Sequence, residues 1–317
     1  MDRRRVLTPE ALAMMDAIAR TGSFAAAARE MGKVPSALTY SVRQLEEALD
    51  VLLFDRSSRQ AVMTAAGHEL LLQGRHLLME MEAVAHRVRR VATGWESALT
   101  IAVDDIVAPR ALFDLMQDFY AQREQGLPPP TQLKLRSEVL SGTWEALLSG
   151  QADLAIGTST QLPGVAVRCE ELGELNMVFC VAPHHPLAAK KQPLTSADIA
   201  RHRIVAVADT ARTLVPVTLG VAPGQETLTL PSMAAKVEAL LRALGCGWLP
   251  RSMVQHQIAA GRLVAMQTQV APRLAKLHYA WRDTGQPPGK ALAWWLQRLA
   301  SPATRQALLE QHDGLLL

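Results

Sequence analysis

Cysteine is scarce in this chain of 317 residues, which contains only Cys169, Cys180 and Cys246. The number is odd and no two of them form a C-x-x-C pair, so the sequence predicts neither a disulfide framework nor a cysteine zinc site. We interpret the three thiols as small buried hydrophobic groups. The alternative is a redox-sensing cysteine.

Long uncharged apolar runs are also missing. No stretch approaches the ~18 apolar residues of a membrane helix, and Asp16 and Arg20 interrupt the only candidate for a signal-peptide core. We therefore expect residence in the cytoplasm and no membrane partner. The net charge of +3 is too small to identify a nucleic-acid binder by itself.

The motifs of common enzymes are missing as well. The chain has no G-x-S-x-G elbow, no G-x-x-x-x-G-K-[ST] loop and no H-E-x-x-H metal motif. The segment LGCGW (244–248) lacks the third glycine and the acidic residue of a dinucleotide site, and the pair His184 and His185 lacks further metal ligands. The sequence thus predicts no catalytic residue, no metal site and no cofactor.

The length and the 49% of hydrophobic residues are enough for two or three domains with substantial cores. The first domain begins with a series of short helical patterns. Thr8 is placed to cap a helix that opens with Pro9, and Ser23 is placed to cap a second helix that ends near Met31. Gly32 then supplies a turn.

The third helix runs from Pro35 to about Leu49 and has two different faces. Its inner stripe is apolar, and Leu38 follows Ala28 and Gly32 at the spacing of a helix-turn-helix. Its outer face carries groups that can bond phosphates or base edges in a major groove, the alternative being a plain solvated face. These outer residues are Ser36, Thr39, Tyr40 and Arg43.

The next segment, VLLFDRSSRQAVMT (51–64), has the strand, turn and strand pattern of a two-stranded wing. Arg56 and Arg59 lie near its tip, where guanidinium groups are suited to hold DNA phosphates. The candidate DNA-contacting residues of the whole module are Ser23, Ser36, Thr39, Tyr40, Arg43, Arg56 and Arg59.

Thr64 is placed to cap a long helix in which apolar residues repeat every seven positions. The positions of this seam are Leu70, Gly74, Leu77, Met81, Val84, Val88 and Val91. Such a repeat predicts a coiled-coil contact and hence a dimer, which would place two reading helices on two half-sites of DNA. The alternative is a helix that packs on its own C-terminal domain.

Together these segments resemble the LysR-type transcriptional regulators of bacteria. The resemblance is carried by SFAAAAREMG, by TYSVRQLEEALDVLLFDR, by the threonine and glycine of MTAAG and by the long helix after them, and it is strongest over residues 8–94. It implies a winged helix-turn-helix domain at 1–64, a dimerisation linker helix at 65–94 and an effector-binding domain at 95–317.

Two positions depart from the family pattern. Pro35 stands where a glutamine is usual, and Thr39 stands where a serine is usual. Because that glutamine often contributes to DNA contact in the family, we expect base readout here to depend more on Ser36, Thr39 and Tyr40.

From Leu99 onward short apolar runs alternate with helical patterns. The first series is LTIAV, PRALFDLMQDFYAQ, QLKLRSEVL, TWEALLSG and ADLAIG, a β-α-β-α-β pattern. A second series holds MVFCVAP, HRIVAVA and MAAKVEALLRALGCGWLP. After LHYAW, a terminal helix with Trp294 and Trp295 is expected to return to the first lobe. The fold class is therefore α/β, and the resemblance implies two lobes of periplasmic-binding-protein type, lobe I at about 97–168 and 270–300 and lobe II at about 169–269.

Ligands of doubly wound sheets bind at the carboxyl ends of strands, near the N-termini of helices. The resemblance selects the same loops, the second-lobe loop running from 206 to 210. The candidate effector-binding residues are Asp104, Asp105, Ile106, Val139, Leu140, Ser141, Ala206, Val207, Ala208 and Met233.

Asp104 and Asp105 stand where many family members have a serine or threonine that holds a ligand carboxylate. Two acidic residues would repel such a ligand. This favours a neutral, hydroxylated, nitro-substituted or amino-bearing effector, with aromatic molecules among the candidates. The alternative is that both aspartates cap the helix that begins near Pro109.

The sequence thus predicts a sequence-specific DNA-binding transcriptional regulator, not an enzyme, whose activity is controlled by an effector bound between two lobes. Its expected partners are double-stranded promoter DNA, the small-molecule effector, RNA polymerase and a second copy of the chain, and the resemblance implies a homotetramer. The alternative is a solute-binding or enzymatic α/β protein with a helical dimerisation unit, which would show no sequence-specific DNA affinity.

Overall fold

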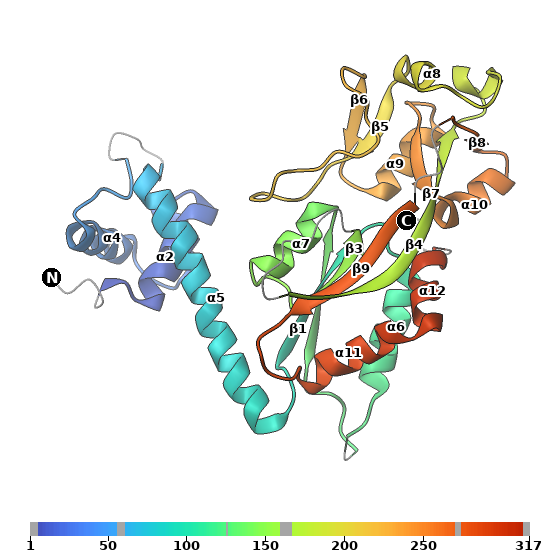
Figure 1. Cartoon of the computed structure of the whole chain (residues 1–317). Coiled ribbons are helices and arrows are strands. Elements are labelled where there is room, and N and C mark those ends of the chain that lie inside the picture. The colour runs from blue at the N-terminus through green and yellow to red at the C-terminus, as the bar shows by residue number, and fades with distance from the viewer. Residues whose placement is uncertain (1–5, 56–60, 125, 159–166, 270–273, 313–317) are drawn as a thin grey trace. The chain divides into compact units, whose positions relative to one another are not determined.

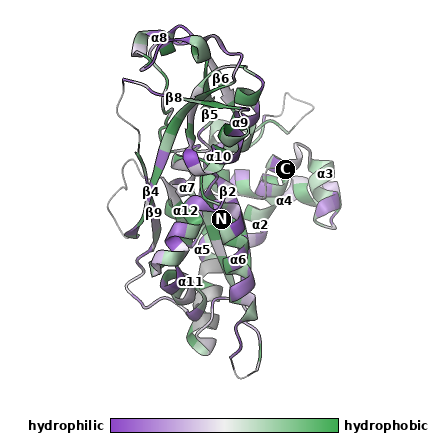
Figure 2. Ribbon diagram, turned by 90° about the vertical axis from the view of Figure 1, so that its right-hand side faces the viewer, coloured by the Kyte–Doolittle hydropathy of each residue, from purple (hydrophilic) through white to green (hydrophobic). Residues whose placement is uncertain are grey.

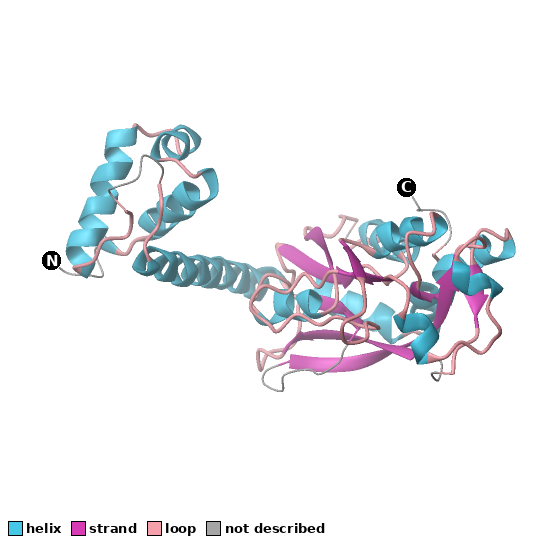
Figure 3. Cartoon of the chain, turned by 90° about the horizontal axis from the view of Figure 1, so that it is seen from above, coloured by secondary structure: helices cyan, strands magenta, loops and turns pink. Residues whose placement is uncertain are grey.

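The computed structural model describes residues 6–55, 61–124, 126–158, 167–269 and 274–312. Contacts divide the chain into two compact units, Met1–Val88 and Arg89–Leu317. Figure 3 shows that the named strands belong to the second unit, whereas the first is built from helices and loops. None of the described helices combines the length and the apolar character needed to cross a membrane.

The first unit holds α2 (Pro9–Thr21), α3 (Phe24–Glu30), α4 (Pro35–Leu49) and most of α5 (Ala65–Thr93) (Figure 1). The predicted caps are confirmed. Thr8 Oγ1 accepts a hydrogen bond from the Ala11 amide at 3.2 Å, and Ser23 Oγ accepts one from the Ala26 amide at 3.3 Å. The helix-turn-helix expected from the spacing is therefore present.

The core of this unit forms where the helices cross. Ala27 and Ala28 of α3 are fully buried, and because their side chains are small, α3 approaches its neighbours closely. Other side chains that share this core are Met14, Met15, Ile18, Leu38, Val42, Leu45, Leu53 and Phe54. The predicted apolar inner stripe of α4 is thus present, with Leu38, Val42 and Leu45 buried.

The base of the predicted wing is a short antiparallel pairing. Phe54 and Met63 form a β-bridge, and the amide of Asp55 donates to the carbonyl of Val62 at 2.8 Å. Phe54 is buried, as predicted, and meets Phe24 of α3 edge-on with ring centroids 5.1 Å apart. The base of the wing is therefore fixed to the helix-turn-helix core.

The long helix α5 begins as predicted at a threonine cap. Thr64 Oγ1 donates to the Leu52 carbonyl at 2.7 Å and accepts from the Gly67 amide at 3.1 Å. A Cβ at Gly67 would lie 2.2 Å from the Leu53 carbonyl oxygen, which explains the glycine. The MTAAG motif thus joins the wing to α5.

The positions of the predicted seam on α5 differ in their surroundings. Leu70 packs against the core of the first unit, and a Cβ at Gly74 would lie 3.0 Å from Leu12 of α2. These two positions therefore serve the DNA-binding unit itself. The later seam residues, listed here with their exposed fractions, are Leu77 (53%), Met81 (53%), Val84 (49%), Val88 (66%) and Val91 (80%).

The second unit is built on one mixed sheet. In spatial order its strands are β2 (Gln132–Glu138), β1 (Ala98–Asp104), β3 (Leu154–Thr158), β9 (Leu274–Arg282), β4 (Val167–Val181) and β7 (Gly247–Pro250), with β8 (Val264–Met266) also paired to β4. β1 is parallel to β2 and β3, and β9 is antiparallel to β3 and β4. The predicted β-α-β-α-β series is confirmed.

Strand β4 connects two lobes. It pairs with β9 over Val167–Asn176 and with β7 and β8 over Met177–Val181. Lobe I contains β1, β2, β3 and β9 with α6 (Pro109–Ala121), α7 (Ser141–Leu148), α11 (Lys290–Ala300) and α12 (Pro302–Glu310). As predicted, the terminal helix returns to lobe I, where the ring centroids of Trp294 and Phe119 of α6 lie 5.3 Å apart.

Lobe II contains β7 and β8 together with a small parallel sheet. Its other elements are η1 (Pro186–Ala189), α8 (Ser196–Ala200), β5 (Ile204–Val207), β6 (Thr227–Leu230), α9 (Met233–Leu241) and α10 (Arg251–Ala259). All four residues of β5 are buried, and Figure 2 colours this strand as hydrophobic. Such continuous apolar runs are typical of strands covered on both faces.

Candidate nucleic-acid interface and effector site

The outer face of α4 is free of the core. Ser36, Thr39, Tyr40 and Arg43 are all exposed, and the Tyr40 side chain is 63% exposed although it is large and aromatic. The opposite stripe of α4 is buried at Leu38, Val42 and Leu45. These four predicted residues therefore lie together on one accessible face.

Short hydrogen bonds along α4 order part of this face. Thr39 Oγ1 donates to the Pro35 carbonyl at 3.0 Å, and Gln44 Nε2 donates to Tyr40 Oη at 2.9 Å. The side chains of Thr39 and Tyr40 are thereby held along the helix surface, and their hydroxyl oxygens can still accept a hydrogen bond from a partner. The arrangement suits contact with base edges and phosphates.

The other predicted DNA contacts divide into two groups. Ser23 uses its hydroxyl to cap α3, so its direct role in the structure is to begin that helix. Arg56 and Arg59 lie outside the described residues.

Sequence reasoning missed Glu46, which orders the segment between α4 and the wing. This glutamate is buried, with 7% of its surface exposed. Its Oε1 accepts hydrogen bonds from the amides of Leu53 at 2.8 Å and Phe54 at 3.4 Å. An acidic residue beside the inner stripe of α4 was the available signal, because a buried carboxylate requires donors.

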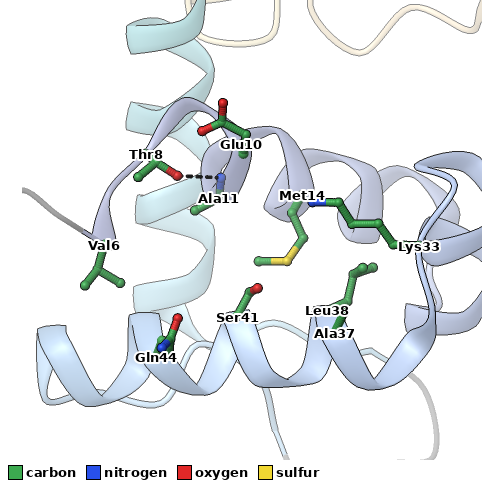
Figure 4. A pocket seen from close by; sticks show the side chains of 10 residues that line it. All are labelled: Val6, Thr8, Glu10, Ala11, Met14, Lys33, Ala37, Leu38, Ser41 and Gln44. Carbon is green, nitrogen blue, oxygen red and sulfur yellow. Dashed lines mark hydrogen bonds between the residues drawn. The ribbon is translucent and has the colours of Figure 1, made fainter.

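A pocket of about 590 Å³ lies beside the outer face, between α2 and α4. Figure 4 shows Met14 reaching from α2 toward Ser41 and Leu38, with Gln44 farther along α4. The lining residues are Val6, Thr8, Glu10, Ala11, Met14, Lys33, Ala37, Leu38, Ser41 and Gln44. The pocket is therefore lined both by Leu38 of the buried stripe of α4 and by Gln44, which bonds Tyr40 of the outer face.

The predicted effector-binding loops of lobe I meet at Asp104. This side chain is 2% exposed. Its Oδ2 accepts from Thr158 Oγ1 at 2.9 Å and from the Leu140 amide at 3.2 Å, and its Oδ1 accepts from the Ile106 amide at 3.3 Å. Asp104 therefore binds three chain segments together at the carboxyl ends of β1, β2 and β3.

Asp105 reaches the other lobe. Its Oδ2 accepts a hydrogen bond from the amide of Met233, the first residue of α9, at 2.5 Å. The alternative that the two aspartates cap the helix at Pro109 is wrong, because that helix has Ala108 at its N-cap and no side-chain cap. The structure thus brings Asp105 and Met233, predicted separately, into direct contact.

The predicted residues at the end of β5 have two fates. Ala206 and Val207 are buried, 2% and 8% exposed, and Val207 belongs to the hydrophobic core. Ala208 is half-buried, and its amide donates to the Leu230 carbonyl of β6 at 2.8 Å. The polar side chains of this loop come next, at Asp209 and Thr210, which lie within the predicted loop 206–210 but were not among the named candidate residues.

Those two residues cross to lobe I. Asp209 accepts from the amides of Ser141 at 3.3 Å and Gly142 at 3.2 Å, and the Thr210 hydroxyl donates to Glu138 Oε2 at 2.7 Å. Ser141 and the neighbouring Val139 and Leu140 thus follow β2, as predicted, and the amides of Val139 and Ser141 donate hydrogen bonds to Thr210 and Asp209 of the second lobe.

Burial sets the electrostatics of this face. Desolvation, strengthened by the charge of Asp105, raises the pKa of Asp104 to about 7, against hydrogen bonds that favour the carboxylate. Desolvation also raises the pKa of Asp105 and lowers the pKa of Lys236 on α9 to about 8 in spite of the nearby Asp105. Within the described ranges no group of three histidine, cysteine or acidic side chains could hold a metal ion.

These features define a class: a winged helix-turn-helix DNA-binding module followed by a two-lobed α/β domain with polar groups at the carboxyl ends of its strands. Family models match both parts, the bacterial regulatory helix-turn-helix of the lysR family at residues 9–68 and the LysR substrate binding domain at residues 92–302. The chain belongs to the LysR family, and it is a transcriptional regulator with a DNA-binding and an effector-binding domain, not an enzyme.

Curated relatives and solved structures agree. The probable transcriptional regulator YhaJ of Escherichia coli K12 is 38% identical over 300 residues, covering 94% of this chain and 98% of YhaJ. PunR of the same strain is 33% identical over 294 residues, covering 92% and 93%. Two solved structures share the fold. Full-length CbnR in complex with its target DNA has a TM-score of 0.60 and 16% identity, covering 92% of this chain and 98% of CbnR. A full-length OxyR variant of Pseudomonas aeruginosa has a TM-score of 0.54 and 18% identity, covering 97% of this chain and 98% of OxyR.

Proposed function

We propose that the outer face of α4 reads operator DNA while the wing arginines hold its phosphates. The carrying observation is the exposed polar face of α4 on a helix whose other stripe is buried. Because Pro35 stands where the family usually has a glutamine, we assign the direct contacts with base edges to Ser36, Thr39 and Tyr40. Arg43 bonds guanine or a phosphate.

Capture of genomic DNA tests this proposal. Fragments of the source genome are bound to purified protein at about 150 mM salt, where nonspecific binding is weakened, and the retained fragments are sequenced. We expect discrete promoter sites. Uniform retention, or none, would instead favour the solute-binding or enzymatic alternative.

Two substitutions then divide the interface. We expect Arg43→Ala to relax sequence preference, with about 1–3 kcal/mol of discrimination lost at its base pair. Arg56→Ala should weaken binding to all sequences alike and reduce the salt dependence by about one phosphate contact. Competition binding with operator and scrambled duplexes separates the two effects, and wild-type behaviour of both variants would contradict the assignment.

We infer that the effector carries no carboxylate and binds at the face formed by Asp104, Asp105 and the start of α7. The buried acidic pair supports this, because a second anion beside it would be repelled. Neutral, hydroxylated, nitro-substituted or amino-bearing molecules, including aromatic ones, suit the site. Thermal shift assays with matched pairs such as benzamide and benzoate test the inference, and stabilisation by the acid alone would refute it.

We further propose that the chain acts in the cytoplasm as a homodimer joined through the exposed part of α5, with pairing of dimers to tetramers and contact with RNA polymerase at promoters. The exposed seam on α5 supports the dimer. In this scheme residues 1–64 bind DNA, 65–94 dimerise and 95–317 bind the effector. An effector that prefers one arrangement of the effector domains resets the spacing of the paired DNA-binding modules.

A further inference from the structure

The start of α7 offers four consecutive amide donors, and side chains of this same chain satisfy all of them. Leu140 has φ +52°, an unfavourable value for a residue with a side chain, and this turns the amides of residues 139–142 toward side-chain oxygens. The contacts are Val139 N to Thr210 Oγ1 (3.0 Å), Leu140 N to Asp104 Oδ2 (3.2 Å), Ser141 N to Asp209 Oδ2 (3.3 Å) and Gly142 N to Asp209 Oδ1 (3.2 Å).

In three of these four contacts the acceptor is a side chain of lobe II. These acceptors lie in residues 208–217, a segment that we call the strap, which follows β5 and reaches α7 (Figure 1). Amide arrays of this kind, at a helix N-terminus, are the backbone features that bind anionic and other acceptor groups. In this structure the strap supplies those groups.

The strap is itself ordered by carboxylates. Asp209 also accepts from the amides of Ala211 at 2.9 Å and Val217 at 2.8 Å. Burial raises the pKa of Asp209, but these amide bonds outweigh it and keep the pKa below its usual value. The acceptor on α7 is Glu145, which takes the strap amides of Arg212 (3.0 Å), Thr213 (2.8 Å) and Leu214 (2.9 Å).

The exchange between the lobes is reciprocal. Asp209 of lobe II occupies the first amides of α7 in lobe I, and Asp105 of lobe I occupies the first amide of α9 in lobe II. The N-termini of α7 and α9 thus each hold a carboxylate from the opposite lobe. The amide hydrogen bonds favour the charged form of both carboxylates, although burial outweighs them at Asp105. These two exchanges join the lobes in addition to β4 and to the Ser252 Oγ–Leu309 carbonyl hydrogen bond of 2.9 Å between α10 and α12.

Close packing shows how tightly the strap fills its place. Gly142 is buried, and a Cβ there would lie 1.9 Å from Thr210 Oγ1. The adjacent Thr143 is fully buried, and within the described part of the chain its hydroxyl has no hydrogen-bond partner. Buried hydroxyls are normally paired, so the packing of the strap against α7 leaves the Thr143 hydroxyl unsatisfied.

We propose that the strap is an internal occupant of the effector face: Asp209 and Thr210 take the positions on α7 that an effector would take, and an effector acts by displacing them. This inference rests on the proposed function, because it concerns the same face. It makes Asp209 a specificity-determining residue. An acid that replaced Asp209 on the Ser141 and Gly142 amides would lie close to Asp104, which accepts from the neighbouring Leu140 amide, whereas a neutral hydrogen-bonding molecule carries no charge for Asp104 to repel.

Chemical rescue of Asp209→Ala in the full chain tests the occupancy. The variant exposes the Ser141 and Gly142 amides, and we expect the melting temperature of the effector domain to fall by about 3–8 °C. Formate at about 100 mM should restore more of this loss than chloride at the same ionic strength or formamide. Asp114→Ala, an exposed aspartate of α6, is the matched control and should show no formate-specific gain.

Gly142→Ala provides a second route that leaves every carboxylate in place. Its methyl group clashes with Thr210, so the strap amides of residues 212–214 should lose hydrogen-exchange protection while tryptophan fluorescence still reports a folded effector domain. In promoter assays both variants should change transcription without effector, and in the same direction. Retained protection of the strap in Gly142→Ala, or a formate response of Asp209→Ala no larger than that of wild type, would overturn the proposal.

The two levels of inference fail separately. Formate rescue and hydrogen exchange use no DNA, so they report on the strap even if no operator site is found. Discrete operator binding with a wild-type effector response in both variants would leave the regulator intact and refute the strap as its control element.

Discussion

At the scale of single residues, Asp104 gives the effector domain a pH dependence. Burial and the neighbouring Asp105 raise its pKa in the folded state to about 7, from an ordinary value of 3.8. Between these two values the folded state binds more protons than the unfolded state. Stability therefore falls as pH rises from about 4 to about 7, by an amount on the order of a few kcal/mol.

We expect Asp104→Asn to flatten this dependence, because the amide side chain does not ionise. The measurement is urea unfolding of wild type and variant at pH 5 and pH 8, followed by tryptophan fluorescence, since all six tryptophans lie at position 95 or later. Asp114→Asn is the control. If wild type and Asp104→Asn lose stability equally between the two pH values, the titrating group is another one.

Glu46 supports a second prediction. Glu46→Ala leaves the amides of Leu53 and Phe54 without their acceptor, at a cost of about 1–3 kcal/mol to the DNA-binding unit. Glu46→Gln keeps an oxygen and should cost less. Hydrogen exchange of amides in residues 9–54 measures the loss, with the exposed neighbour Glu47→Ala as control. Equal protection in Glu46→Ala and Glu47→Ala would contradict the assigned role.

The range of an interaction decides which residues the sequence could predict. The caps Thr8, Ser23 and Thr64 bond amides three residues ahead, so a local pattern is sufficient. Glu46 bonds amides seven and eight residues away, and Asp209 bonds amides 67 and 68 residues away. Such pairings depend on how segments meet in three dimensions, and no local pattern encodes them.

At the scale of elements, α5 is the clearest case of a pattern with two uses. Its repeat is continuous in sequence, yet Leu70 and Gly74 pack within the first unit, whereas the seam positions Leu77, Met81, Val84, Val88 and Val91 are exposed. Periodicity identifies an apolar stripe on a helix but does not say which partner covers each part of it. The helices and strands were predictable because periodicity is a local property of the sequence. The point on α5 where packing within the first unit gives way to exposed residues was not predictable, because it depends on which segment covers the stripe.

The exposed part of α5 carries the third prediction. Val84→Asp places a charge in the middle of the proposed seam, so the dimer should dissociate at about 10 µM and affinity for a two-half-site operator should fall at least about tenfold. Light scattering after size exclusion measures the mass. His76→Asp, exposed and outside the seam, should remain dimeric. A dimeric Val84→Asp would show that another surface joins the subunits.

At the scale of the whole molecule, the effector domain combines one continuous strand with separable contacts. β4 belongs to both lobes, so they cannot part completely. The carboxylate exchanges of Asp105 and Asp209 can break one by one, because each consists of a few hydrogen bonds. We expect an effector that replaces these contacts to shift the population toward a second arrangement of the lobes.

Linkage then fixes how effector and DNA affect each other. If an effector changes operator affinity by a given factor, operator DNA must change effector affinity by the same factor. For a typical coupling of about 1–3 kcal/mol this factor is about 5–150. Titrating operator at saturating effector, and effector at saturating operator, should return equal factors. Effector affinity that is unchanged by operator, beside an intact transcriptional response, would place the control step after DNA binding, at the contact with polymerase.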